Sequence, residues 1–204
     1  MATEQVRTLE LGPHFTRFVD EMRAAWAAGQ DATLPERGRR LLEALLRETP
    51  ADEAWVAGLL RDRPAARELY RDPDFGFLQM GHFHLAGNGG APHDHGPYWV
   101  LYGVYRGEIA INKYRRTDGS TGTGATELEV VETAHLTAGS VFPYLPGEIH
   151  TPRSLDPNGS IVMRFLSGDV DAIERFRFKP LDDANTLVPT ELPKAGRYQA
   201  VFGR

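Results

Sequence analysis

Cysteine is absent from the whole 204-residue sequence. Its absence excludes disulfide bonds, thiolate metal ligands and cysteine nucleophiles, so a bound metal would need nitrogen or oxygen ligands. An excess of positive charge is also absent, because the formal net charge is -5 and the lysines and arginines are scattered along the chain. The composition therefore argues against a nucleic-acid partner and favours a small-molecule substrate.

Long apolar segments are missing as well. No run approaches the roughly 20 residues that cross a bilayer. Residues 1–18 carry early acidic residues and lack the apolar stretch of a secretory signal. We therefore expect no membrane partner and a cytoplasmic location. The length suits one domain with its own core, and it leaves a monomer and a homo-oligomer equally open.

Apolar residues recur at helical spacing in the first third of the chain. One stripe runs over residues 15–26, a second over 41–46 and a third over 55–60. A short fourth helix is expected at residues 65–70. These stripes predict a helical N-terminal segment that occupies residues 1–72.

From about residue 75 the sequence changes to short runs rich in β-branched and aromatic residues, separated by glycine-rich breaks. Such spacing is typical of an antiparallel sandwich or barrel. We predict a mainly β single domain, in which a barrel over residues 73–168 follows the helical segment. Residues 169–204 are expected to form a tail that packs on the barrel, with a short helix at 170–176.

Three histidines occur at spacings that suit a metal site. His93 and His95 are separated by one residue, so on a strand their imidazoles project to the same face. His150 follows the tight-turn sequence Pro146-Gly147. Three imidazoles with open coordination positions suit iron(II), nickel, manganese, copper or zinc. Histidines on strands are also often structural, so the first pair alone is weak support for a metal.

The order of the residues around these histidines resembles the two sequence motifs of the cupin superfamily. The matching residues are His93-x-His95 followed by Gly107, then Gly139 followed by Pro146-Gly147-x-x-His150. This resemblance implies a small double-stranded β-helix barrel, or jelly-roll, with a metal bound inside it.

The glutamate ligand of the first cupin motif has no counterpart here, because counting back from Gly107 places Val100 at its position. The sequence thus resembles the three-histidine cupins, and among them the thiol dioxygenases, cysteine dioxygenase and 3-mercaptopropionate dioxygenase. Three stretches carry the likeness: LYRDPDFGFLQM, GNGGAPHDH and WVLYGVYRGE. It implies ferrous iron on the three histidines, with the substrate and dioxygen binding beside one another at the metal.

The resemblance also implies an arginine that holds a substrate carboxylate. Arg67 lies near the matching position, with Arg71 as a neighbour, and a guanidinium can grip a carboxylate with two hydrogen bonds. A solvated arginine is the alternative. The Ser-x-His-x-Tyr relay of the thiol dioxygenases is missing, because no histidine follows His150. On the corresponding strand, Arg164 is expected either to hold an anionic substrate or to make a structural ion pair.

His82 and His84 are a second departure from those enzymes. When the glycine loops before the metal motif are aligned, His84 takes the place of a tryptophan that lines the pocket. Both imidazoles are then expected inside the barrel, as substrate hydrogen-bonders or proton carriers, and satisfied core histidines are the alternative. Alternation from position 100 turns Tyr102 inward too, where its phenol either serves the metal site or closes the barrel end.

Taken together, the residues and the resemblance predict a non-haem iron(II) dioxygenase that oxidises a small polar or anionic molecule with dioxygen. The altered surroundings of the metal argue against an ordinary small thiol as substrate. Two alternatives stay open. One is a non-redox metal enzyme, such as a lyase, isomerase or hydrolase, and the other is a cupin that binds or senses a small molecule without turnover.

Overall fold

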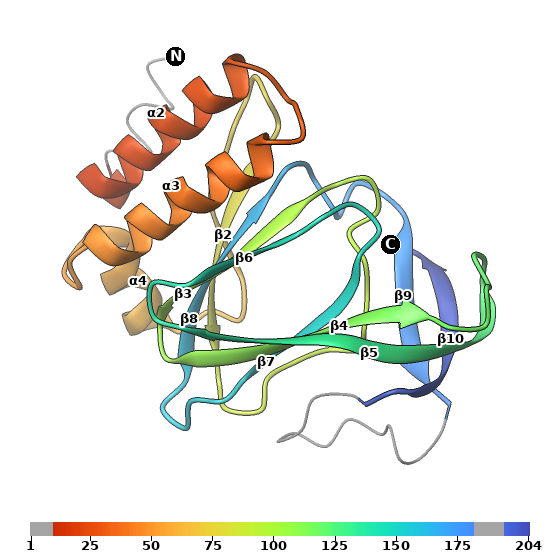
Figure 1. Cartoon of the computed structure of the whole chain (residues 1–204). Helices are drawn as coiled ribbons and strands as arrows, with labels where there is room; N and C mark the ends of the chain where they lie inside the picture. The colour runs from red at the N-terminus through yellow and green to blue at the C-terminus, as the bar shows by residue number, and fades with distance from the viewer. Residues whose placement is uncertain (1–9, 182–193) are drawn as a thin grey trace.

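The computed structural model describes residues 10–181 and 194–204, in which a layer of helices lies against two β-sheets (Figure 1). Residues 1–9 and 182–193, which include the ends of the predicted helical segment and part of the predicted tail, lie outside the described residues. The helices precede the strands in the chain, so the order of elements follows the order predicted from the sequence.

Three helices form the layer: α2 (Pro13–Ala27), α3 (Leu34–Glu48) and α4 (Ala54–Asp62). They confirm the three predicted stripes, because each helix buries the apolar side that the spacing marked. Leu42 of α3 and Trp55 of α4 share one core cluster with Phe165 of the barrel. No helix in the described part of the chain is long and apolar enough to cross a membrane.

Within the described residues, ten strands form two sheets of five strands each. The first sheet has the order β1 (Arg67–Arg71), β2 (Leu78–His84), β8 (Ser160–Leu166), β3 (Val100–Arg106), β6 (Val141–Tyr144). The second sheet has the order β7 (Ile149–Ser154), β4 (Glu108–Arg116), β5 (Gly124–Thr137), β10 (Gly196–Gly203), β9 (Arg175–Pro180). The helices cover the outer face of the first sheet (Figure 1).

The chain passes repeatedly from one sheet to the other. Strands β3 and β4 are consecutive in the sequence but lie in different sheets, and so do β6 and β7. Every pairing within the two sheets is antiparallel. This arrangement confirms the predicted fold class: a mainly β jelly-roll, or double-stranded β-helix, with helices at its N-terminal end.

Two of the expected helices are wrong. Residues 67–70 of the stretch expected as a fourth helix belong to the edge strand β1, because their backbone pairs antiparallel with β2. The short helix expected at 170–176 is replaced by turns, and strand β9 begins at Arg175. Strand β9 pairs with β10, about twenty residues later in the chain. Pairing between distant segments overrides local helical spacing at both places.

Alternation along β3 separates the inside of the barrel from the face that meets the helices. The residues that face into the barrel are Val100, Tyr102 and Val104, which share a cluster with strands β4 and β8. Leu101 instead joins the helical cluster. Gly103 faces α3 so closely that a Cβ added there would lie 2.6 Å from the Leu46 side chain. The predicted inward face of this strand is therefore confirmed.

Candidate functional site

The three predicted ligand histidines meet inside the barrel. His150 lies on β7, and its backbone exchanges two hydrogen bonds with His93, at 3.0 and 2.9 Å. His95 follows two residues later. The ring centroids of the three imidazoles are 5.1, 5.0 and 5.0 Å apart, so the rings form a nearly equilateral triangle. One nitrogen from each ring can lie within 4.8 Å of the other two.

Backbone carbonyls fix which nitrogen of two of these rings is free. Nδ1 of His93 lies 3.0 Å from the Ala91 carbonyl, and Nδ1 of His150 lies 3.1 Å from the Glu148 carbonyl. Because a carbonyl only accepts, each Nδ1 must be the protonated donor, and each Nε2 keeps a lone pair. Such outer hydrogen bonds typically orient metal-binding histidines. In His95, the buried Nδ1 has no partner among the described residues.

Burial keeps the three imidazoles uncharged. Loss of hydration lowers the pKa of His93 to about 4, and it lowers the pKa values of His95 and His150 well below the usual range. The positive charges of Arg164 and Arg175 add to the effect. Metal binding requires the neutral imidazole, so the cluster is in its binding form at neutral pH.

These residues fit a divalent metal ion. Three neutral imidazoles form a donor set that suits iron, nickel, manganese, copper and zinc. Val100, at the position of the cupin glutamate ligand, is fully buried within the barrel cluster. A metal held by His93, His95 and His150 would therefore receive no carboxylate from that position and would keep open coordination sites.

Two tyrosines lie against the histidine cluster. The Tyr102 hydroxyl is 3.5 Å from Nε2 of His95 and 3.4 Å from Nε2 of His150. Its predicted position beside the cluster is thus observed. Tyr144 was not among the predicted residues, yet its ring stacks on His150 with centroids 4.0 Å apart. Tyr144 is paired with Val100 in the β3–β6 ladder, so both side chains face into the barrel. A sequence prediction that paired these two strands could have found it.

A cavity of about 450 Å³ reaches this cluster through His93 and Tyr102, which both line it. The same cavity is lined by three further predicted site residues, His82, His84 and Arg164. Their strands belong to the first sheet, whereas His150 belongs to the second. The inward orientation predicted for the two histidines of β2 is therefore found, and the cavity brings five predicted residues together.

Polar atoms in this cavity lack protein partners. His82 is 6% exposed; its Nδ1 lies 2.8 Å from the Ala65 carbonyl, and its buried Nε2 has no partner among the described residues. The buried Nδ1 of His84 and Nε of Arg164 are also without partners in the described part of the chain. Burial, followed by the charge of Arg164, lowers the pKa of His82 to about 3 and that of His84 to about 4.

The other two predicted arginines lie apart from the cavity lining. Arg67 pairs with Asp62 at 2.8 Å, and Arg71 pairs with Glu68 and Asp169 at 2.7 Å each. Neither arginine lines the cavity. Carboxylates of the chain itself thus occupy both guanidinium groups in this structure, and their binding of a substrate carboxylate stays a prediction.

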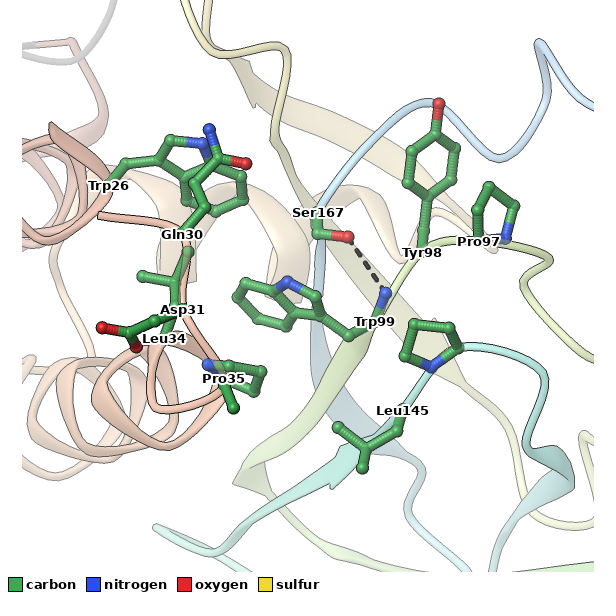
Figure 2. Close-up of a pocket in the computed structure, with 12 residues that line it drawn as sticks. Trp26, Gln30, Asp31, Leu34, Pro35, Pro97, Tyr98, Trp99, Leu145 and Ser167 are labelled. Atoms are coloured by element: carbon green, nitrogen blue, oxygen red, sulfur yellow. Dashed lines mark hydrogen bonds between the residues drawn. The ribbon is translucent and has the colours of Figure 1, made fainter.

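A second cavity, of about 500 Å³, lies between the helices and the rim of the barrel (Figure 2). Trp26 and Leu34 line it from the helical side, and Tyr98 and Trp99 line it from the barrel side. The Trp99 backbone N–H donates to the Ser167 hydroxyl at 3.0 Å. None of the predicted site residues lines this cavity.

Comparisons with known proteins give no family model and no curated protein that matches this chain. Solved structures with partial likeness include KdgF from Halomonas sp., at 16% identity and TM-score 0.39, covering 53% of this chain and 83% of that one. The cupin domain of Cnp3 from Schizosaccharomyces pombe is 10% identical, with TM-score 0.40 and coverages of 52% and 66%. A cupin-2 domain protein from Shewanella frigidimarina is 15% identical, with TM-score 0.35 and coverages of 49% and 76%.

Proposed function

We propose that the protein is a mononuclear non-haem iron(II) dioxygenase that acts on a small polar or anionic molecule. The observation that supports it best is the convergence of three neutral imidazoles, one of which, His93, lines a cavity, with a valine where a fourth ligand would stand. His93, His95 and His150 would hold the metal. Ferrous iron in such a site supplies open coordination positions and a redox centre for dioxygen.

The protein's own residues would prepare the substrate. The Tyr102 hydroxyl, close to two of the ligand nitrogens, is placed to donate a hydrogen bond to a group bound at the metal. His84 lines the cavity with a ring nitrogen that lacks a partner among the described residues, so it can form a hydrogen bond with the substrate. His82 and Arg164 would hold the rest of the molecule.

Metal analysis and oxygen uptake test the proposal. The protein should be purified without added metal, analysed for metal content, loaded with iron(II) and then offered thiols, amino acids and phenolic acids in an oxygen electrode. We expect iron to be retained and at least one compound to drive oxygen consumption. Oxygen consumption should be lost in His150→Ala and retained in a His135→Ala control, since His135 is an exposed residue on β5.

A non-redox metal enzyme, such as a lyase, isomerase or hydrolase, is the second candidate. The pair of histidines in the cavity favours it, because His82 and His84 can hydrogen-bond and orient a substrate while a metal acts only as a Lewis acid. Retention of zinc or nickel, with no oxygen uptake for any compound of the panel, would decide for this candidate. Thermal stabilisation by a compound that is never converted would instead indicate a binding or sensing protein.

A further inference from the structure

We infer that Arg164, His82 and His84 form a receptor for an organic acid that carries both a carboxylate and an O–H or N–H donor. The inference deepens the proposed function, because it assumes that the bound acid is the substrate of the metal centre. It assigns the carboxylate to Arg164 on β8, rather than to either of the arginines on β1.

The strand register brings these side chains to one inner wall. Arg164 pairs with Met80 on β2 and with Tyr102 on β3, so it projects to the same side as both. His82 and His84 follow Met80 at intervals of two residues, and alternation keeps them on that side. The rings of the two histidines lie 5.3 Å apart. All three side chains line the cavity that also reaches His93.

Charge identifies one part of the ligand. Among the described residues that line the cavity, Arg164 is the charged one, and no aspartate or glutamate faces it there. Its Nε is buried without a partner. A partly buried guanidinium without a counter-charge is costly, so the cavity favours an anion that supplies one. A planar carboxylate matches the hydrogen-bonding fork of the guanidinium.

Hydrogen bonding identifies the other part of the ligand. Nδ1 of His82 must donate to the Ala65 carbonyl, since a carbonyl only accepts. The ring is uncharged, so Nε2 carries a lone pair, and this buried atom needs a donor that the described residues do not provide. A hydroxyl or amine on the ligand would meet this need. His84, also with an unpartnered ring nitrogen, can accept from or donate to the same ligand.

The position of this receptor relative to the histidine cluster suggests how the acid reaches the metal. His93 and Tyr102 line the same cavity as Arg164. One small molecule can therefore rest its carboxylate on the first sheet while another part of it faces the histidine cluster. The receptor wall and the metal wall would then select the substrate jointly.

Matched pairs of compounds test the receptor on zinc-loaded protein, which cannot oxidise them. The probes are lactate and lactamide, 3-hydroxybutyrate and 3-hydroxybutyramide, and 2-hydroxybenzoate and 2-hydroxybenzamide, with propionate as an acid that lacks the hydroxyl. Binding is measured by calorimetry and by thermal shift. We expect at least one hydroxy acid to bind about tenfold or more tightly than its amide, because the amide cannot form a charge-assisted pair with Arg164. Lactate should bind more tightly than propionate.

Arginine variants localise the effect. Arg164→Met should weaken acid binding at least about tenfold, while Arg164→Lys, which keeps the charge, should retain part of it. Arg115→Met is the matched control, since Arg115 is exposed and pairs with Glu129. Circular dichroism checks that the variants fold, and the acid and amide comparison in the wild type needs no variant. Equal binding of acids and amides, no binding of any acid, or undiminished binding by Arg164→Met would each overturn the inference.

The outcome also separates this inference from the proposed function. Acid binding that depends on Arg164, without oxygen uptake by the iron-loaded protein, would keep the receptor and reject the dioxygenase. Oxygen uptake that is driven by a neutral compound and unaffected in Arg164→Met would keep the dioxygenase and reject the receptor.

Discussion

At the scale of single residues, the candidate metal centre depends on backbone carbonyls as much as on side chains. The carbonyls of Ala91 and Glu148 hold Nδ1 of His93 and His150, and so direct Nε2 of each ring toward the shared space. Hydrogen bonds of this kind affect metal affinity strongly in other proteins. Local backbone geometry around His93 and His150 therefore prepares the site for a bound ion.

Removal of one ligand should abolish metal retention. His150→Ala should lower metal affinity by more than about 100-fold, the upper end of what loss of a supporting hydrogen bond costs. Metal content after gel filtration, measured by mass spectrometry, checks this. His135→Ala is the control, because His135 is a histidine with an exposed side chain on β5. Full metal occupancy in His150→Ala would show that the site assignment is wrong.

The buried His82 should make stability depend on pH. Burial lowers its pKa to about 3 in the folded protein, whereas a histidine in an unfolded chain titrates near about 6.5. Between these values the unfolded chain binds a proton that the folded chain does not, so this position reduces stability as the pH falls below about 6.5. His82→Gln should flatten that fall by up to about 1.4 kcal/mol per pH unit.

Urea unfolding of metal-free protein at several pH values between 7 and 5 measures this slope. His135→Gln should leave the slope unchanged, because that side chain is exposed. An identical slope in wild type and His82→Gln would mean that His82 takes up its proton without cost in the folded state.

At the scale of elements, one carboxylate joins the start of α2 to the start of α4. Glu53 precedes α4, and its buried side chain accepts hydrogen bonds from the backbone N–H groups of His14 and Phe15, each at 3.1 Å. It also accepts from Nδ1 of His14 at 2.5 Å. The N–H groups in the first turn of α2 have no acceptor inside the helix, and Gly12 at the N-cap has no side chain to accept from them. The Glu53 carboxylate supplies that acceptor.

Loss of this carboxylate should weaken the helical layer. Glu53→Ala should reduce the free energy of unfolding by about 1–3 kcal/mol, since buried N–H donors lose their acceptor. Glu53→Gln should cost less, because its side-chain oxygen can still accept. The comparison is Glu48→Ala, an exposed glutamate that pairs with Arg17 and should change stability by less than about 0.5 kcal/mol. Equal effects of Glu53→Ala and Glu48→Ala would contradict this role.

The elements also show where sequence reasoning succeeds and where it fails. Alternation along a single strand was enough to turn Val100 and Tyr102 inward, because one face of the sheet is buried by the helices and the other by the second sheet. Strands β1 and β9 were missed, because each depends on a partner that local spacing does not reveal. The register of each pair is decided by contacts with the partner strand, which the spacing within one segment does not show.

At the scale of the whole molecule, the arginine receptor belongs to the first sheet, whereas the histidine cluster is attached to the second through His150 and the backbone pairing of His93. His150 lies on β7, and the backbone of His93 bridges both His150 and Arg177 of β9. The order of the motifs, through its resemblance to the cupin motifs, predicted the three ligands, although His93 and His95 lie outside the named strands. The pairing of Arg71 with Asp169, and the stacking of Tyr144 on His150, come from the three-dimensional arrangement and have no local signal.

A metal ion held by His150 on β7 and by His93 and His95 in the segment between β2 and β3 should stabilise the entire fold. Zinc added to metal-free protein should raise the unfolding midpoint in a concentration-dependent way. The free energy of unfolding should increase by about 2.7 kcal/mol at a free zinc concentration 100 times the dissociation constant. Differential scanning calorimetry with buffered zinc measures this, and a chelator should reverse it. His150→Ala should show no comparable rise, and an equal rise in that variant would place the binding elsewhere.

The division of the cavity between two sheets bears on how such a protein can diversify. The wall that carries His82, His84 and Arg164 belongs to strands packed on their outer face by the helices, whereas His93, the proposed ligand that lines the cavity, pairs with β7 of the second sheet. Natural mutation, or a library randomised at those three positions, can therefore change which acid is bound while the metal ligands stay the same. Homologous proteins could then keep the same metal site and differ in the acid that they bind.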